Sequence, residues 1–303
     1  MLDAKPWKAD AVIRLIFSVF ICMLAGSMIT ALLYLPSASS SSISTTKFIA
    51  VTAAGIGCMV GTLVLLWRPW QLETVMRRTL VILILFYGGM FAGFWVQKVA
   101  EVPSASIKQM VVAALSFQGA GVLLVMRFLR EHQFSWGQAF GVRNRVGMAL
   151  TAGVIVACLF LPVGWGLQQA SAVLMNQLPW FHLKPEEQQS VQALRVASTI
   201  GSRMILAVVT IVLAPIAEEL IFRGVLYPWV KQLGFPRFAL WGTAVIFAAI
   251  HLNLVIFLPL LILAVVLTVL YERTNNLLAP IAAHSLFNGL NFAMLYLLQG
   301  KSG

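Results

Sequence analysis

The sequence contains few charged residues. Only 10% of its 303 residues are Asp, Glu, Lys or Arg, whereas soluble domains carry about 25%. Hydrophobic residues make up 60% of the chain, and the mean hydropathy is +0.90. This composition excludes an ordinary soluble domain and predicts a protein that is embedded in a lipid bilayer.

Cysteine is also scarce. The chain has 3 cysteines, Cys22, Cys58 and Cys158, and they lie far apart in separate apolar runs. This spacing indicates neither a disulfide framework nor a metal cluster built on cysteine.

Long apolar runs, by contrast, are abundant. A membrane-spanning helix needs about 20 mostly apolar residues, and the runs are too long and too uniform for the alternating pattern of barrel strands. We therefore predict an all-α fold, a polytopic transmembrane helical bundle of about eight or nine spans. The predicted spans cover residues 12–35, 48–67, 79–97, 109–127, 147–170, 204–224, 238–252, 255–271 and 277–298.

Acidic residues are half as frequent as basic ones, with 10 against 21, which gives a net charge of +11. The basic residues cluster in short connections around residues 68–78, 127–145 and 231–237. Such clusters are typical of cytoplasmic loops in membrane proteins. We therefore expect a multi-pass protein of the cell membrane with a cytoplasmic N-terminus. The lipid bilayer is its expected partner, and the charge does not indicate nucleic-acid binding.

Ionisable residues within apolar runs are concentrated after residue 204. A charged side chain at the bilayer centre costs roughly 2.5–3.5 kcal/mol, so such residues mark functional sites. Glu218 and Glu219 lie side by side in one of these runs, and His251 and His284 follow. We therefore predict an N-terminal transmembrane scaffold with interfacial segments over residues 1–203 and a catalytic transmembrane domain over residues 204–303.

The stretch "QLGFP" (232–236) predicts a turn between two antiparallel helices. Glu219 lies 15 residues before Gly234, and His251 lies 17 residues after it. At the rise of an α-helix, both residues lie about 22–26 Å from the turn. The two side chains are therefore expected at the same depth in the membrane.

Spacing within each helix predicts separate roles for the two glutamates. Glu219 and Arg223 are four residues apart and can form an ion pair that supports the structure. Glu218 points about 100° away and remains a free carboxylate. Phe247 shares a helix face with His251 and is assigned to structural support. The other polar residues of these helices are assigned to helix packing: Thr243, Thr268 and Asn291.

The candidate catalytic residues are Glu218, His251, His284 and Asn288, and no serine or cysteine is placed as an obvious nucleophile. This set suits attack by an activated water on a carbonyl group. Glu218 and His251 would polarise the water. His284 and Asn288, four residues apart, would donate hydrogen bonds to the oxyanion. The chemistry predicted is peptide hydrolysis without a covalent intermediate.

Three ordered motifs carry a resemblance to a known family. "EELIFRG" (218–224) fits EExxxR, "FAAIH" (247–251) fits FxxxH, and "HSLFN" (284–288) fits HxxxN. Together they resemble the CPBP family of CAAX proteases and bacteriocin-processing enzymes, also called Abi, over about residues 205–298. The resemblance implies an intramembrane endopeptidase of the glutamate type, often labelled a metalloprotease. It also implies a membrane-associated protein or peptide substrate, lipidated or not, and a place in a bacterial inner membrane.

Several alternatives stay open. Glu218, His251 and His284 carry atoms that zinc prefers, but no HExxH is present and Arg223 adds positive charge, so we predict no metal and no cofactor. A transporter would also contain intramembrane charges, although here they are confined to one third of the chain. A catalytically idle bacteriocin-immunity or scaffold protein is the other alternative, and the filled motif positions disfavour it.

Overall fold

A computed structural model of the protein describes residues 5, 7–34, 44–68, 75–100, 106–177 and 189–299. These residues form helices and no strand, which confirms the predicted all-α fold. They divide into two compact units. The N-terminal unit is Ile13–Leu124, and the motif unit combines Met1–Val12 with Val125–Gly303. The division predicted at residue 204 separates a scaffold from the part that carries the candidate catalytic residues, and it does not describe the two compact units. It stays a prediction.

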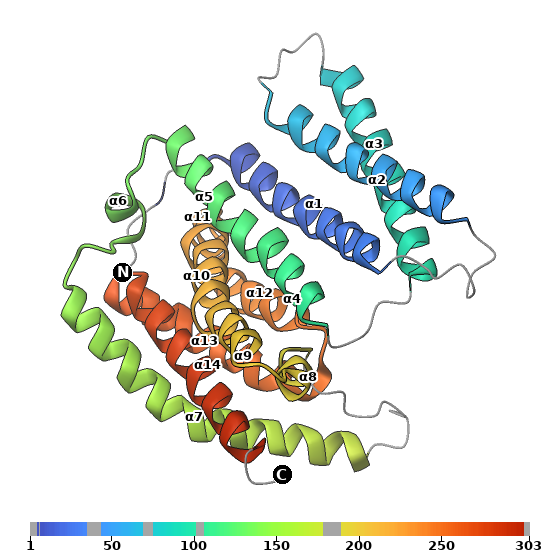
Figure 1. The fold of residues 1–303 in the computed structure, drawn as a ribbon. Coiled ribbons are helices and arrows are strands. Elements are labelled where there is room, and N and C mark those ends of the chain that lie inside the picture. Colours follow the sequence, from blue (N-terminus) through green and yellow to red (C-terminus); the bar gives the residue numbers. More distant parts are fainter. Residues whose placement is uncertain are drawn as a thin grey trace. The chain divides into compact units, whose positions relative to one another are not determined.

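The N-terminal unit is a group of long apolar helices (Figure 1). Its elements are most of α1 (Ala9–Leu33), α2 (Thr45–Leu66), α3 (Val75–Val99), α4 (Ile107–Ala114), the π-helical segment η2 (Leu115–Gly119) and the start of α5 (Ala120–Glu131). Ile21, Met59 and Phe86 form one buried cluster among α1, α2 and α3. A glycine at position 55 allows close packing, because a Cβ there would lie 2.8 Å from the side chain of Ala92 on α3.

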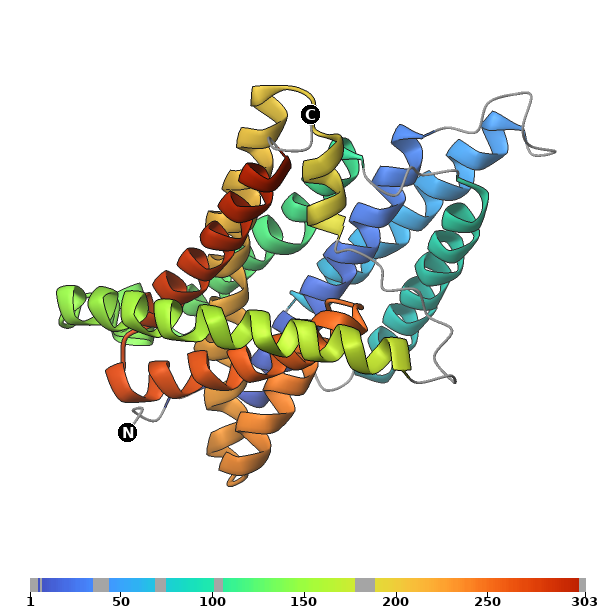
Figure 2. The ribbon, with the colours of Figure 1, turned by 90° about the horizontal axis from the view of Figure 1, so that it is seen from below.

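The motif unit contains all three sequence motifs (Figures 1 and 2). Its first helices are α6 (Trp136–Phe140), α7 (Val146–Gln177) and α8 (Gln189–Val196). Its remaining elements are α9 (Ile200–Ala207), η3 (Val208–Leu213), α10 (Ala214–Glu219), η4 (Leu220–Leu226), α11 (Tyr227–Gln232), α12 (Pro236–Ala249), α13 (Leu254–Thr274) and α14 (Leu278–Gln299). The elements from α9 to α11 are continuous, and we call residues 200–232 the motif helix.

The core of the motif unit lies where α7, α13 and α14 pack together. Phe160, Leu263, Leu267 and Ala283 belong to one buried cluster there. Gly153 lets α7 approach α14 closely, because a Cβ at this position would lie 2.6 Å from a backbone oxygen of α14. This packing fixes α14, which carries His284 and Asn288.

Seven helices in the described part of the chain are long and apolar enough to cross a membrane. The protein is therefore a multi-pass membrane protein. The helix predicted over 238–252 is α12, which has 14 residues and reaches only about 21 Å, so it is not counted among the seven. α14 is long, but it is not among the seven. Its apolar sequence is interrupted by His284, Asn288 and Asn291.

The predicted hairpin is confirmed. The motif helix ends at Gln232, and α12 begins at Pro236. Gly234 adopts φ of 92° in the turn, a conformation that favours glycine. At the other end of α12, Leu252 has φ of 49°, so the chain turns directly after His251 and α13 begins at Leu254.

Candidate active site

The two glutamates lie between two π-helical segments of the motif helix. α10 carries Glu218 and Glu219, with η3 before it and η4 after it. Pro215, in the first turn of α10, has no N–H. The N–H of Ala214 bonds to the carbonyl of Val209, five residues back. The carbonyl of Thr210 is thus left without an α-helical or π-helical donor, because residue 215 is the proline.

Asn288 supplies the missing donor. Its side-chain Nδ2 donates to the carbonyl oxygen of Thr210 at 3.0 Å. An unpaired carbonyl in a membrane segment costs free energy, so this bond stabilises the motif helix next to Pro215. It uses one of the two N–H groups of the Asn288 amide, and the second N–H has no role in this bond.

A second proline produces a similar contact. Pro228, in α11, cannot donate to the carbonyl of Gly224, four residues earlier. The indole Nε1 of Trp7 donates to that carbonyl at 3.3 Å. Trp7 is buried against the rings of Phe128, His132 and Phe134. A residue that precedes α1 therefore contacts the motif helix one residue after Arg223.

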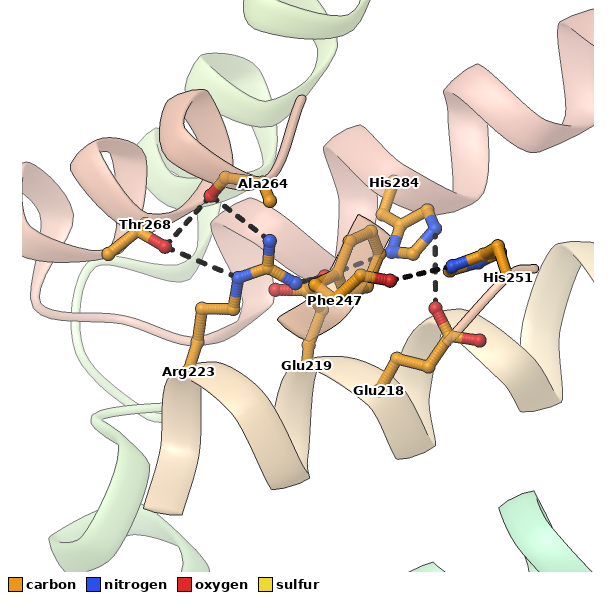
Figure 3. A network of polar contacts seen from close by, with 8 residues as sticks. All are labelled: Glu218, Glu219, Arg223, Phe247, His251, Ala264, Thr268 and His284. Atoms are coloured by element: carbon orange, nitrogen blue, oxygen red, sulfur yellow. Dashed lines mark hydrogen bonds and ion pairs between the residues drawn. The ribbon is translucent and has the colours of Figure 1, made fainter. Parts of the chain in front are cut away.

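Glu219 and Arg223 form the predicted ion pair (Figure 3). Arg223 Nη1 donates to Glu219 Oε1 at 2.7 Å, and the two side chains are 2% and 0% exposed. Arg223 also reaches α13, where Nη2 donates to the carbonyl of Ala264 at 3.1 Å and Nε donates to Thr268 Oγ1 at 3.4 Å. The pair therefore connects the motif helix to α13.

His284 lies between the two glutamates. Its Nδ1 is 2.9 Å from Glu219 Oε1, and its Nε2 is 3.9 Å from Glu218 Oε2. Because an ionised carboxylate only accepts, the Nδ1–H donates to Glu219. In the neutral ring, Nε2 then carries a lone pair toward Glu218. His284 can donate a hydrogen bond from Nε2 only when the ring is protonated.

His251 has its tautomer fixed in the same way. Its Nδ1 is 2.7 Å from the carbonyl oxygen of Phe247, which can only accept, so Nδ1 carries the proton. Nε2 is then the free acceptor of the neutral ring. In Figure 3 the His251 ring points toward the region of Glu218 and His284.

Phe247 contacts three of the other site residues, His251, His284 and Arg223. Its fully buried ring lies 5.1 Å from the His251 ring and 5.9 Å from the His284 ring, between centroids. The guanidinium carbon of Arg223 lies 4.6 Å from the same ring centroid, in cation–π contact. The ring of Phe222 on the motif helix lies 5.3 Å away. α12 thus meets the motif helix at the depth of the motifs, as the hairpin predicted.

The structure brings six of the seven predicted site residues into one connected group. Glu218, Glu219 and His284 are buried, with 7%, 0% and 3% exposure. Asn288 lies one turn beyond His284 on α14, and its hydrogen bond goes to Thr210 instead of to this group. Its predicted oxyanion role stays a prediction, as do the catalytic roles of the other residues.

The partners of Arg223 on α13 were not expected. Thr268 was assigned to helix packing, and it also accepts a hydrogen bond from Arg223. Asn291 does serve packing, since it accepts from Trp165 Nε1 of α7 at 2.8 Å. Thr243 bonds within its own helix. The bond between Asn288 and the Thr210 carbonyl was also missed. Its signal in the sequence is Pro215, because a proline inside a helix leaves a carbonyl of the preceding turn without a backbone donor.

Within the described part of the chain, no three His, Cys, Asp or Glu side chains are grouped so that they could hold a metal ion. Glu219 is already occupied by Arg223 and His284. The prediction that water is activated without a metal remains to be tested by experiment.

The chain was compared with protein families, with curated proteins and with solved structures. Residues 200–290 match the family model described as Type II CAAX prenyl endopeptidase Rce1-like. No curated protein and no solved structure is significantly similar to the chain. The matched residues include the motif helix and all three motifs. The match confirms the resemblance to the CAAX proteases of the CPBP family over residues 200–290.

Proposed function

We propose that this protein is an intramembrane endopeptidase that hydrolyses a peptide bond in a membrane-associated protein or peptide. The observation that carries the proposal is the buried group in which Arg223 and His284 both bind Glu219, while the second nitrogen of His284 faces Glu218. This arrangement leaves Glu218 as the carboxylate that is not part of the Arg223 ion pair. The family match supports the endopeptidase assignment.

Glu218 is proposed as the general base. A water that donates to its carboxylate would lose a proton to Glu218 as its oxygen attacks the carbonyl carbon of the substrate. His251 offers Nε2 as a second acceptor that orients the same water. Glu218 would then return the proton to the amine that leaves when the C–N bond breaks, so no covalent enzyme intermediate is needed.

The oxyanion would be stabilised from α14. The second N–H of Asn288 is one proposed donor. His284 is the other, and its tautomer adds a condition: Nε2 donates only after the ring has gained a proton. Glu219, already paired with Arg223, would stabilise that charged ring through Nδ1. Glu219 is therefore proposed to position His284 and to take no part in proton transfer with the substrate.

The decisive experiment compares membranes that contain the unaltered protein with membranes that contain Glu218→Gln. Glutamine keeps the shape of the side chain but cannot act as the base. We expect cleaved peptides, identified by mass spectrometry of new N-termini, only with the unaltered protein, and a loss of rate of about 10²–10⁴-fold in the variant. The peptides would also reveal whether the substrate is lipidated. Identical peptides in both membranes would support the catalytically idle alternative instead.

A second experiment tests activation of water without a metal. If Glu218 and His251 act alone, purified protein should contain no stoichiometric zinc, and a chelator should leave the cleavage rate unchanged. A zinc enzyme would lose activity with the chelator and regain it with added zinc, because metal-bound water has its lowered pKa of about 7 only while the ion is present. Zinc rescue would overturn the metal-free mechanism and leave the endopeptidase assignment intact.

The orientation in a bacterial inner membrane is also a proposal. The basic connections at 127–145 and 231–237 support a cytoplasmic N-terminus. A variant Arg237→Cys should then react with a membrane-impermeant thiol reagent only from the cytoplasmic side, in a background that lacks the three native cysteines. Labelling only from the opposite side would show that the protein has the opposite orientation in the membrane.

A further inference from the structure

The turn that joins α12 to α13 is the exposed edge of the proposed catalytic group. Leu252, with φ of 49°, lies in this turn, and its side chain is 93% exposed. Ile250, on the other side of His251, is 41% exposed. His251 itself is partly exposed, whereas Glu218 and His284 are buried. The proposed catalytic group is therefore exposed at His251 and enclosed at the two buried residues.

An ion pair marks one surface of the membrane. Lys231, near the end of the motif helix, bonds to Glu272, near the end of α13, and both side chains are partly exposed. At the rise of an α-helix, Glu218 lies about 20 Å from this pair along the motif helix, and Leu254 lies about 27 Å from it along α13. The hydrocarbon core of a bilayer is about 30 Å thick. The turn therefore lies near the opposite surface, and the catalytic group lies closer to that surface than to the ion pair.

The space between the catalytic group and the ion pair is filled by side chains. Residues 220–225 of the motif helix, which follow the two glutamates, are all buried. Arg223 bonds to Thr268 of α13, and its guanidinium contacts the ring of Phe247 of α12. Figure 3 shows Arg223 and Thr268 on one side of the group and His251 on the other. The three helices are thus joined on the side of the ion pair, and the side of the turn is the shorter approach.

The turn also has backbone groups that need hydrogen-bond partners. In the described part of the chain, no backbone N–H donates to the carbonyls of Ile250, His251 or Leu252. Non-helical backbone at membrane depth is tolerated where it is buried in protein or faces water. Because Leu252 is not buried in protein, we expect water to reach this turn.

We propose that water and the peptide to be cleaved reach the catalytic group past this turn, from the membrane surface opposite the connection 231–237. The inference rests on the proposed function, and it adds the side of the membrane on which the substrate is cut. The substrate is then a membrane-associated peptide whose scissile bond can lie about 10 Å below that surface. With the orientation proposed above, this is the non-cytoplasmic surface.

Thiol labelling of the full-length protein in membrane vesicles tests the side of access. Leu252→Cys is made in the background without native cysteines, and vesicles of both orientations are treated with a charged, membrane-impermeant maleimide. We expect labelling from the side opposite to the one that labels Arg237→Cys. Ile246→Cys is the matched control, because Ile246 is 49% exposed but lies within α12. It should react at least about tenfold more slowly, because a thiol reacts as the thiolate, which lipid does not solvate.

Labelling of Leu252→Cys from the same side as Arg237→Cys would overturn the proposal, as would a rate no faster than that of Ile246→Cys. Ile250→Cys provides the same test if Leu252→Cys does not fold. The labelling does not depend on cleavage, so its outcome is separate from that of Glu218→Gln. A protein that is labelled as expected but cleaves nothing would count against the endopeptidase and leave the access of water standing.

Access of the peptide is tested with the same variant in the cleavage assay. A bulky maleimide attached to the thiol of Leu252→Cys should abolish the appearance of new N-termini, because it obstructs the approach to His251. The same reagent on Arg237→Cys should leave cleavage unchanged. Full cleavage after complete modification of Leu252→Cys would overturn this route for the peptide.

Discussion

The two units of the protein bury polar groups in different ways. In the N-terminal unit, the hydroxyls of Thr30, Thr52 and Thr62 each donate to a carbonyl four residues earlier in the same helix. No charged side chain is buried among its described residues. In the motif unit, the buried polar groups include a carboxylate and a guanidinium, Glu219 and Arg223, which take partners from α13 and α14.

The buried hydroxyls of the N-terminal unit find their hydrogen-bond partners within a single helix. The buried charged groups of the motif unit find theirs only when several helices are held in fixed positions. A threonine bonded within its own helix keeps its partner if the neighbouring helix shifts or rotates. Glu219 loses a partner if α14 rotates, and Arg223 loses two if α13 moves. We therefore expect the N-terminal unit to tolerate polar substitutions that the motif unit does not.

The largest effect on stability is expected from Arg223→Ala. Removing the guanidinium leaves Glu219 buried without its cation, at a cost of about 3–5 kcal/mol. The thermal unfolding temperature and the expression level should both fall, whereas Glu218→Gln should change neither by much. Equal destabilisation by the two substitutions would show that the structural and catalytic roles of the glutamates are wrongly assigned.

An intermediate effect is expected from Asn288→Leu. It leaves the Thr210 carbonyl without a donor, at a cost of about 1–3 kcal/mol in unfolding free energy. Pro215→Ala supplies a backbone N–H that can bond to this part of the helix, so the cost of Asn288→Leu should be smaller in that background. A double-mutant cycle measures this coupling.

The same cycle distinguishes two roles of Asn288. If Asn288 also donates to the oxyanion, Pro215→Ala should restore stability to Asn288→Leu without restoring cleavage. Additive stability effects would mean that Pro215 is not the reason for the Asn288–Thr210 bond.

The smallest expected effect is a difference in unfolding free energy between one threonine variant in each unit. Thr52→Val and Thr268→Val each remove a threonine hydroxyl from a buried position, with 0% and 1% exposure respectively. The first should cost less than about 0.5 kcal/mol, because the Phe48 carbonyl keeps its backbone donor. The second should cost about 0.5–1.5 kcal/mol, since Nε of Arg223 loses its acceptor. Unfolding in a graded denaturant measures both, and equal costs would contradict the distinction between the units.

Spacing along one helix predicted part of the site. Glu219 and Arg223 are four residues apart, and residues at this separation share a face in any helix. The turn at Gly234 placed α12 opposite the motif helix, because the rise per residue fixes the depth of each side chain. The long apolar runs likewise predicted a multi-pass helical protein, since a bilayer requires them.

Contacts between helices depended on the tertiary structure. That His284 donates to Glu219 and faces Glu218 follows from the rotation of α14, which the packing of α7 and α13 sets. The link from Arg223 to α13 could not be predicted, because it uses a backbone carbonyl, and every residue has one. The sequence by itself determined which polar groups enter the membrane and at what depth. Only the tertiary structure decided which group pairs with which, because hydrogen bonds between helices depend on rotations that no linear spacing encodes.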